Sequence, residues 1–188
     1  GFIKQLAGLG KPIVLSTGMY RESDVIEALE TCSRAGCREL ALLHCVSSYP
    51  APDSDVNLAA MDRMRDLFSG PIGYSDHTPD HLASIAAVAR GAQVIEKHIT
   101  ILRDVPNAQD WKVSCGPEDF PLFVDSLRRT EAMIGSREKR PTGAETSALS
   151  WALKSLVAAR SLPRGHILEI GDISAKRPGT GIPPNRIG

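Results

Sequence analysis

The sequence lacks an excess of charge of either sign, and it lacks long apolar runs. Its 188 residues carry 22 lysine and arginine side chains and 22 aspartate and glutamate side chains. Without a broad basic face, little affinity for nucleic acid comes from released counterions. The longest uncharged run in an apolar helix-like segment, residues 82–89, is far shorter than the roughly 20 residues that span a bilayer. No secretory pattern opens the chain. We therefore expect a cytoplasmic protein with no nucleic-acid or membrane partner.

Cysteines are few and scattered. Cys32, Cys37, Cys45 and Cys115 form neither a CxxC pair nor a zinc-finger spacing. Cys45 lies in an apolar run, where a reduced thiol packs well. The pattern predicts buried thiols.

Four strand-then-helix units follow one another along the first part of the chain. The predicted strands are short apolar runs near residues 13–15, 40–43, 72–74 and 94–95. The predicted helices show apolar residues at helical spacing near residues 25–32, 58–67, 79–89 and 120–133. The third of these helices is expected to have Thr78 as its N-cap, Pro79 at its first position and Leu82 on its apolar face. Because the strands are continuous apolar runs, they predict a parallel sheet covered by helices, which is an α/β fold.

Polar residues gather where each predicted strand ends, from Ser16 and Thr17 to His44, Ser75, His77, Glu96 and His98. This placement is typical of a TIM-type βα barrel, whose active site forms at the carboxyl ends of its strands. An open flavodoxin-like sheet shares the rule. Four units cannot close an eight-stranded barrel, so the barrel interpretation requires a missing first half and covers only the C-terminal portion.

A change of composition divides the chain. Residues 136–148 are polar and irregular, which is typical of a linker, and strand-like runs then occur at 155–159 and 167–170. We predict a barrel portion over residues 1–135, a linker over 136–150 and a small β-rich piece over 151–188.

His77 and His98 follow consecutive predicted strands, so they should lie close together on one face of the sheet. Imidazole is a common ligand of divalent transition metals, and two ligands leave open positions that suit catalysis. The alternative is that each ring only caps a strand end or bonds a loop. Pro79 disfavours a pairing of His77 with His81, and His81 is expected to face solvent.

Glu96 precedes His98 by two residues, so both side chains leave the same face of an extended strand, while Lys97 points outward into the helix layer. A carboxylate there can bind a metal, orient a histidine or transfer a proton. A solvated Glu–Lys pair is the alternative.

Further candidates for ligand binding are hydroxyl groups near the strand ends, which suit the oxygens of a phosphate or carboxylate: Ser16, Thr17, Ser47, Ser48 and Ser75. Tyr49 and Asp110 are candidates for contacts to a polyhydroxylated substrate. Arg177 lies in a glycine-rich loop that could reach an anion or an acyl oxygen. Each of these residues taken alone is equally consistent with an ordinary loop or surface position.

Several motifs closely resemble signatures of the sialic acid synthase family. They are LSTGM at 15–19, LHC at 43–45, SYP at 48–50, VNL at 56–58, GYSDHT at 73–78 and VIEKH at 94–98. Residues 155–159 through 176–181 are similar to the start of the antifreeze-like (SAF) domain that follows the barrel in these enzymes. The resemblance covers nearly the whole chain in the expected order.

The resemblance implies an N-acetylneuraminate synthase-type transferase that condenses phosphoenolpyruvate with an N-acetylmannosamine-type sugar and releases phosphate. It implies a divalent metal, Mn²⁺ first with Mg²⁺ or Co²⁺ as alternatives, and a domain-swapped homodimer of the full-length protein. By resemblance, His77 and His98 match the metal ligands, Glu96 the catalytic carboxylate and Ser75 a phosphoenolpyruvate contact. The remaining matches are substrate contacts: Ser47, Tyr49, Asp110 and, from the partner subunit, Arg177.

Two departures from the family pattern shape the expected function. Residues 105–114 replace the usual Pro-Gly-Pro-Asp-His stretch, so a pseudaminic or legionaminic acid synthase is an alternative. The family's N-terminal strands, which bring lysine and glutamate residues to the substrates, are absent from this chain. We therefore expect a fragment that is inactive alone, and a non-catalytic product or sugar-binding module is the alternative of a different class. A Schiff-base aldolase is disfavoured because Lys97 points to the wrong side of its strand.

Overall fold

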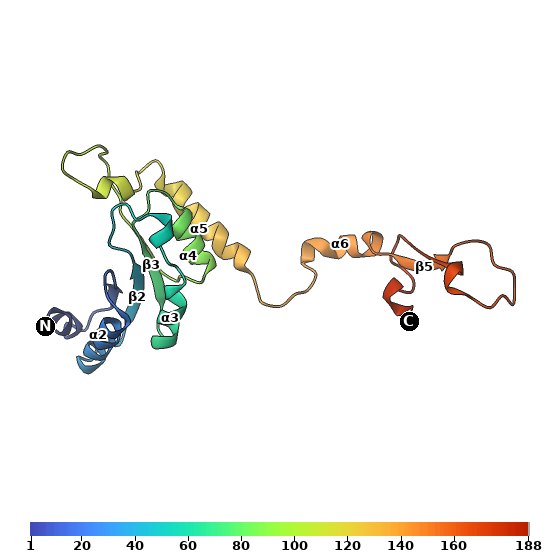
Figure 1. Cartoon of the computed structure of the whole chain (residues 1–188), viewed down its shortest axis with the longest axis horizontal. Coiled ribbons are helices and arrows are strands. Elements are labelled where there is room, and N and C mark those ends of the chain that lie inside the picture. Colours follow the sequence, from blue (N-terminus) through green and yellow to red (C-terminus); the bar gives the residue numbers. More distant parts are fainter. Residues whose placement is uncertain (188) are drawn as a thin grey trace. The chain divides into compact units, whose positions relative to one another are not determined.

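The apolar runs of the first part of the chain form a four-stranded parallel sheet in the computed structural model, which describes residues 1–187 (Figure 1). The strands are β1 (Ile13–Ser16), β2 (Leu40–Cys45), β3 (Ile72–Asp76) and β4 (Ile95–Lys97). They pair in the order β1-β2-β3-β4. A flavodoxin-like sheet would place its second strand outside its first, so the sequential order favours the barrel interpretation over the open one. The predicted α/β class is confirmed.

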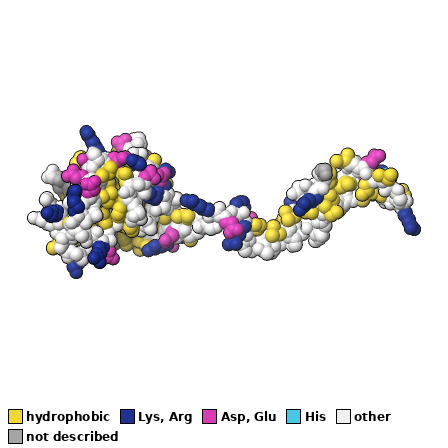
Figure 2. All heavy atoms as spheres, turned by 90° about the horizontal axis from the view of Figure 1, so that it is seen from below, with side chains coloured by type: hydrophobic (Ala, Val, Ile, Leu, Met, Phe, Trp, Pro, Cys, Tyr) yellow, Lys and Arg dark blue, Asp and Glu magenta, His cyan; other side chains and the backbone are white. Residues whose placement is uncertain are grey.

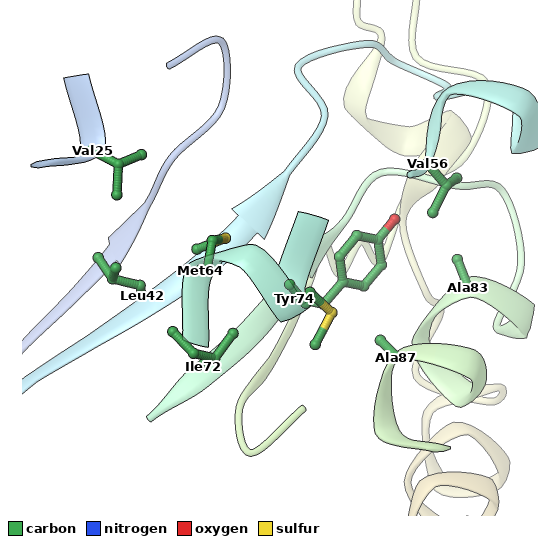
Figure 3. Close-up of a cluster of buried hydrophobic side chains, with 9 residues drawn as sticks. Val25, Leu42, Val56, Met64, Ile72, Tyr74, Ala83 and Ala87 are labelled. Atoms are coloured by element: carbon green, nitrogen blue, oxygen red, sulfur yellow. The ribbon is translucent and has the colours of Figure 1, made fainter. Parts of the chain in front are cut away.

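Five α-helices belong to the same part of the chain, α1 (Phe2–Ala7), α2 (Glu22–Arg34), α3 (Ala60–Leu67), α4 (Leu82–Ala89) and α5 (Phe120–Ile134). Helix α3 packs against β2 and β3 and helix α4 packs against β3, and a cluster of buried apolar side chains lies at these contacts (Figure 3). Leu42, Met61, Ile72 and Tyr74 are each at most 1% exposed. Burial of a large apolar side chain contributes about 1.5–3 kcal/mol, so this cluster fixes the strand ends that carry the polar residues.

The start of α4 differs from the sequence prediction. The helix begins at Leu82 after His81, not at Pro79 after Thr78. Both the backbone N–H and the hydroxyl of Thr78 donate to the buried Asp76 carboxylate, so Thr78 is not available as a helix cap. The apolar face is rotated accordingly, because Leu82 is 63% exposed while Ala83 and Ala87 are buried.

The chain divides into two compact units, and the second begins at Ser136. It contains α6 (Gly143–Ala152), β5 (Ser155–Ala158) and β6 (Ile173–Lys176), with β5 and β6 antiparallel. The prediction of an irregular linker over 136–150 was wrong for residues 143–150, because Thr142 and Glu145 form a capping box that starts α6. The apolar run at 167–170 is not a strand. Its isoleucines, Ile167 and Ile170, are 85% and 79% exposed.

The surface of the molecule mixes both signs of charge. Figure 2 shows lysine and arginine side chains interspersed with acidic ones on the face in view. Among the helices of residues 1–187, none is both long enough and apolar enough to span a bilayer. All four cysteines are free. Cys32, Cys45 and Cys115 are buried as predicted, whereas Cys37 is partly exposed, so the prediction was wrong for that residue.

Candidate functional site

The ends of β3 and β4 bring four polar residues to one face of the sheet. The parallel register places Ser75 opposite Glu96, and the Ser75 hydroxyl donates a 2.6 Å hydrogen bond to Glu96 Oε1. His77 follows Ser75 by two residues, and His98 follows Glu96 by two residues. The two histidine rings lie with their centroids 5.1 Å apart at an interplanar angle of 63°. The period of two in an extended strand explains why each histidine shares a face with the polar residue two positions before it.

The ring of His77 is fixed by a backbone carbonyl. His77 is 5% exposed, and its Nδ1 lies 2.7 Å from the carbonyl oxygen of Val46. A carbonyl oxygen only accepts, so Nδ1 carries the proton and donates it. In a neutral ring the other nitrogen, Nε2, then carries the lone pair, which is the arrangement found in histidines that bind metals.

The donor set fits a metal held by two imidazoles. His98 is the more open of the two, with a side chain 33% exposed and Nδ1 4.0 Å from Asp110 Oδ2. Among residues 1–187, no three His, Cys, Asp or Glu side chains gather closely enough to hold a metal by themselves. Two protein nitrogens leave several coordination positions for water, substrate or other residues, which suits a catalytic metal better than a structural one.

Glu96 is oriented by two hydroxyl groups. In addition to Ser75, the Ser16 hydroxyl at the end of β1 donates to Glu96 Oε1 at 3.3 Å. Both bonds go to the same carboxylate oxygen, so Oε2 is left for a substrate or a water molecule. This is a suitable arrangement for a proton-transfer group, because the carboxylate is held in place and still exposed.

The loop after β2 covers the histidine pair with an aromatic ring. The Tyr49 ring lies 4.2 Å from the His77 ring and 5.7 Å from the His98 ring, edge-on to the latter. Partial burial raises the pKa of the Tyr49 hydroxyl, so the phenol stays protonated and can donate a hydrogen bond. The same loop carries Ser47 close to Gly18. A Cβ at Gly18 would lie 2.9 Å from the Ser47 Oγ, and its φ of +47° also favours glycine.

The remaining predicted site residues differ in their position relative to the histidine pair. Thr17 donates its hydroxyl to the Leu43 carbonyl and Ser48 donates to the Pro50 carbonyl, so both serve the local backbone. His44 also faces away from the pair. Asp110 begins a short 3-10 helix (Asp110–Val113), and its side chain is 70% exposed beside His98. Arg177 belongs to the second unit, where its Nε donates to the Ala152 carbonyl.

Two features of the site were not predicted from the sequence. Cys45 pairs in register with Ser75, and its thiol lies 3.7 Å from His77 Nδ1. Burial raises the pKa of this thiol, so it remains neutral. The second feature is a buried ion pair between Asp76 and Lys97 behind the histidines. Strand alternation could have placed Cys45 on the site face, and it did direct Lys97 outward, but it does not reveal the partner of Lys97. The prediction that His81 faces solvent was wrong, because His81 is half-buried against Phe123.

The chain is similar to several known proteins. A model of the NeuB family matches residues 1–139. The N,N'-diacetyllegionaminic acid synthase of Campylobacter jejuni is 38% identical over 183 residues, covering 96% of this chain and 54% of that protein. The pseudaminic acid synthase of Helicobacter pylori is 31% identical over 182 residues, covering 97% of this chain and 53% of that protein.

A solved structure shows the same arrangement of elements. The crystal structure of the N-acetylneuraminic acid (sialic acid) synthetase from Leptospira borgpetersenii, in complex with citrate, matches with a TM-score of 0.71 and 32% identity. The match covers 79% of this chain and 51% of that chain. The chain spans about half the length of the curated relatives it matches.

Proposed function

Because the chain belongs to the NeuB family, as its motifs predicted, we propose that the full protein is a sugar-acid synthase that joins phosphoenolpyruvate to an N-acetylated hexose. The enol carbon bonds to the aldehyde carbon of the open-chain sugar, water adds at the neighbouring carbon, and inorganic phosphate leaves. The product is a nine-carbon 2-keto acid. The observation that carries the proposal is the cluster of Ser75, Glu96, His77 and His98 on one face of the strand ends.

In this proposal His77 and His98 hold a divalent metal through ring nitrogens, with Mn²⁺ as the first candidate and Mg²⁺ or Co²⁺ as alternatives. The chemistry that such an ion supplies when bound is polarisation of the aldehyde oxygen. The Val46 carbonyl supports this role by keeping the His77 proton on Nδ1. Residues outside this chain, water or substrate would complete the coordination.

Glu96 is the proposed proton acceptor for the water that adds to the substrate. Its Oε1 is occupied by Ser75 and Ser16, which aims the carboxylate and leaves Oε2 free. The Ser75 hydroxyl is the proposed contact to phosphoenolpyruvate. Ser47 and Tyr49 on one loop and Asp110 on another line the sugar side, where hydroxyl, phenol and carboxylate groups can bond sugar hydroxyls.

We also propose that residues 151–188 begin an antifreeze-like (SAF) domain and that the full protein is a domain-swapped homodimer. In such a dimer Arg177 of one subunit would contact the sugar bound by the other. An exposed guanidinium at the end of β6 is compatible with that role, because it offers several donors beyond the Nε bond to Ala152.

Release of inorganic phosphate tests the function. The full natural protein is mixed with phosphoenolpyruvate, Mn²⁺ and, in separate reactions, N-acetylmannosamine or the hexose precursors of legionaminic and pseudaminic acid. We expect release that requires both the metal and one of the sugars, and that is lost in His98→Ala. The 188-residue chain alone is expected to release none. A full protein that folds but releases no phosphate with any sugar would instead support a non-catalytic sugar-binding module.

The loop over residues 105–114 bears on the choice of sugar. This loop departs from the family pattern directly before and around Asp110. The chain is similar both to a legionaminic acid synthase, at 38% identity, and to a pseudaminic acid synthase, at 31% identity. The three sugars are therefore arms of one assay.

A further inference from the structure

A buried ion pair lies directly behind the two histidines. The register that pairs Ser75 with Glu96 also pairs Asp76 with Lys97, and the side chains of the latter two point to the opposite, helix-covered side. Lys97 Nζ lies 3.4 Å from Asp76 Oδ2, and the two side chains are 2% and 0% exposed. Asp76 immediately precedes His77 in the chain, and Lys97 immediately precedes His98.

Most polar contacts of this pair go to the segment that follows His77, and one goes to helix α4. Asp76 accepts hydrogen bonds from the backbone N–H and hydroxyl of Thr78, at 2.8 and 2.7 Å, and from the hydroxyl of Ser84. Lys97 Nζ donates to the carbonyl oxygens of Thr78 and Asp80, at 2.5 and 3.0 Å. Lys97 on β4 is therefore bonded to residues on both sides of His77, which fixes the spacing between the two strand ends.

A buried ion pair is an expensive way to stabilise a fold. Removing two charges from water costs free energy that their attraction repays only with good geometry, and apolar residues of similar volume are often at least as stable. Most partners of this pair lie in the segment that follows His77, so its presence is better explained by the geometry that it imposes there. Groups that orient metal-binding histidines typically affect metal affinity strongly when they are removed.

We propose that Asp76 and Lys97 are positioning residues that set the separation and orientation of the His77 and His98 rings. The inference rests on the proposed function in one respect, because it takes these histidines as the metal ligands. Neither residue touches substrate. Their effect passes through the backbone, since each directly precedes one of the two histidines and the two side chains are paired with each other.

The test uses Mn²⁺ binding to the full natural protein, followed by the electron paramagnetic resonance signal of free Mn²⁺. Asp76→Asn keeps the shape of the side chain and removes its charge, and Lys97→Met keeps the length and removes the donor. Each is expected to weaken Mn²⁺ binding by about tenfold or more, measured well below the unfolding temperature. The double variant, Asp76→Asn with Lys97→Met, leaves no unpaired charge to prevent folding and is expected to show the same loss.

Met61→Ala is the matched control for stability. Met61 is 0% exposed in the core and contacts neither histidine segment by hydrogen bonding, so its truncation lowers the melting temperature without moving the rings. We expect its Mn²⁺ affinity to stay within about twofold of wild type, as for residues that do not orient ligands. Equal Mn²⁺ affinity in the double variant and in wild type would overturn the positioning role.

A second readout separates this proposal from the metal assignment. Crystal structures of the wild-type and double-variant proteins give the separation of the two rings without any bound metal. We expect the variant rings to depart from the 5.1 Å centroid separation, and an unchanged separation overturns the proposal. If wild-type protein binds no Mn²⁺, or His98→Ala binds it as tightly, the metal assignment fails and the ring separation alone decides the positioning role.

Discussion

Glu96 accepts hydrogen bonds from two hydroxyl groups. A variant can therefore keep these hydrogen bonds and lose only the ability to transfer a proton. Glu96→Gln retains an oxygen that can accept the Ser75 and Ser16 hydrogen bonds, but an amide cannot take a proton from water. We predict that kcat for phosphate release falls by about 10²–10⁴-fold while KM for phosphoenolpyruvate changes little. Steady-state kinetics of the full protein measure both constants. A large rise in KM with unchanged kcat would instead assign Glu96 to substrate binding.

In Tyr49 the role of the aromatic ring can be tested separately from the role of the hydroxyl. The ring packs against both histidines, whereas the hydroxyl is the group proposed to contact the sugar. We predict that Tyr49→Phe raises KM for the sugar about tenfold, as for the loss of one hydrogen bond, and leaves Mn²⁺ affinity unchanged. Tyr49→Leu should weaken both. Sugar kinetics and Mn²⁺ titration of the two variants check this, and equal effects of Phe and Leu on the metal would contradict it.

The alternation of side chains along a strand was enough to predict much of the candidate site. It placed Glu96 with His98 and turned Lys97 to the other face, as the structure shows. The position of Tyr49 over His77 could not be predicted in this way. It depends on the conformation of a loop that is tied to His77 by a backbone hydrogen bond from Ala51, and such contacts between distant residues leave no periodic signal.

The position of the loop after β2 depends on His44, which lies in that strand. The buried His44 Nε2 bonds the Val56 carbonyl at 2.8 Å, which fastens the far end of the segment that carries Ser47 and Tyr49. Burial lowers the pKa of His44, so the folded protein favours the neutral ring. Below about pH 6.5 the unfolded state binds more protons than the folded state, and stability therefore falls as the pH falls.

We predict that this loss of stability at low pH arises from His44. Thermal unfolding of the full protein between about pH 5 and pH 8 should show a melting temperature that falls more steeply below pH 6.5 in wild type than in His44→Gln. Glutamine keeps an N–H donor for the Val56 carbonyl and has no charge to gain. Parallel pH profiles of the two proteins would show that His44 does not titrate in this range.

The elements themselves were predicted where the apolar pattern was continuous and missed where a polar side chain decided the boundary. All four strands of the parallel sheet follow apolar runs. The start of α4 could not be predicted in this way, because Thr78 is hydrogen-bonded to Asp76 and does not cap the helix. Helix α6 did carry a usable signal, the capping box of Thr142 and Glu145, which the neighbouring Pro141 and Gly143 obscured.

At the scale of the whole molecule, the described sheet is open. Over residues 1–187, β1 pairs only with β2, and the β4 ladder pairs only with β3. Large apolar side chains beyond β4 are also uncovered, with Ile99 at 71% and Ile101 at 85% exposed. Open edges and uncovered apolar side chains favour association with further strands. The relatives are about twice as long, so the proposed activity is expected of the longer protein.

The proposed exchange of Arg177 between subunits can be decided by mixing two inactive proteins. In a His98→Ala subunit the barrel is disabled while Arg177 is intact, and in an Arg177→Ala subunit the reverse holds. If Arg177 serves the partner's site, each mixed dimer regains one complete site of two. With the two variants in equal amounts, random reassociation after mild denaturation makes half of the dimers mixed and should restore about a quarter of wild-type phosphate release. If Arg177 acts within its own subunit, no mixed dimer has a complete site, and the mixture stays as inactive as its parents.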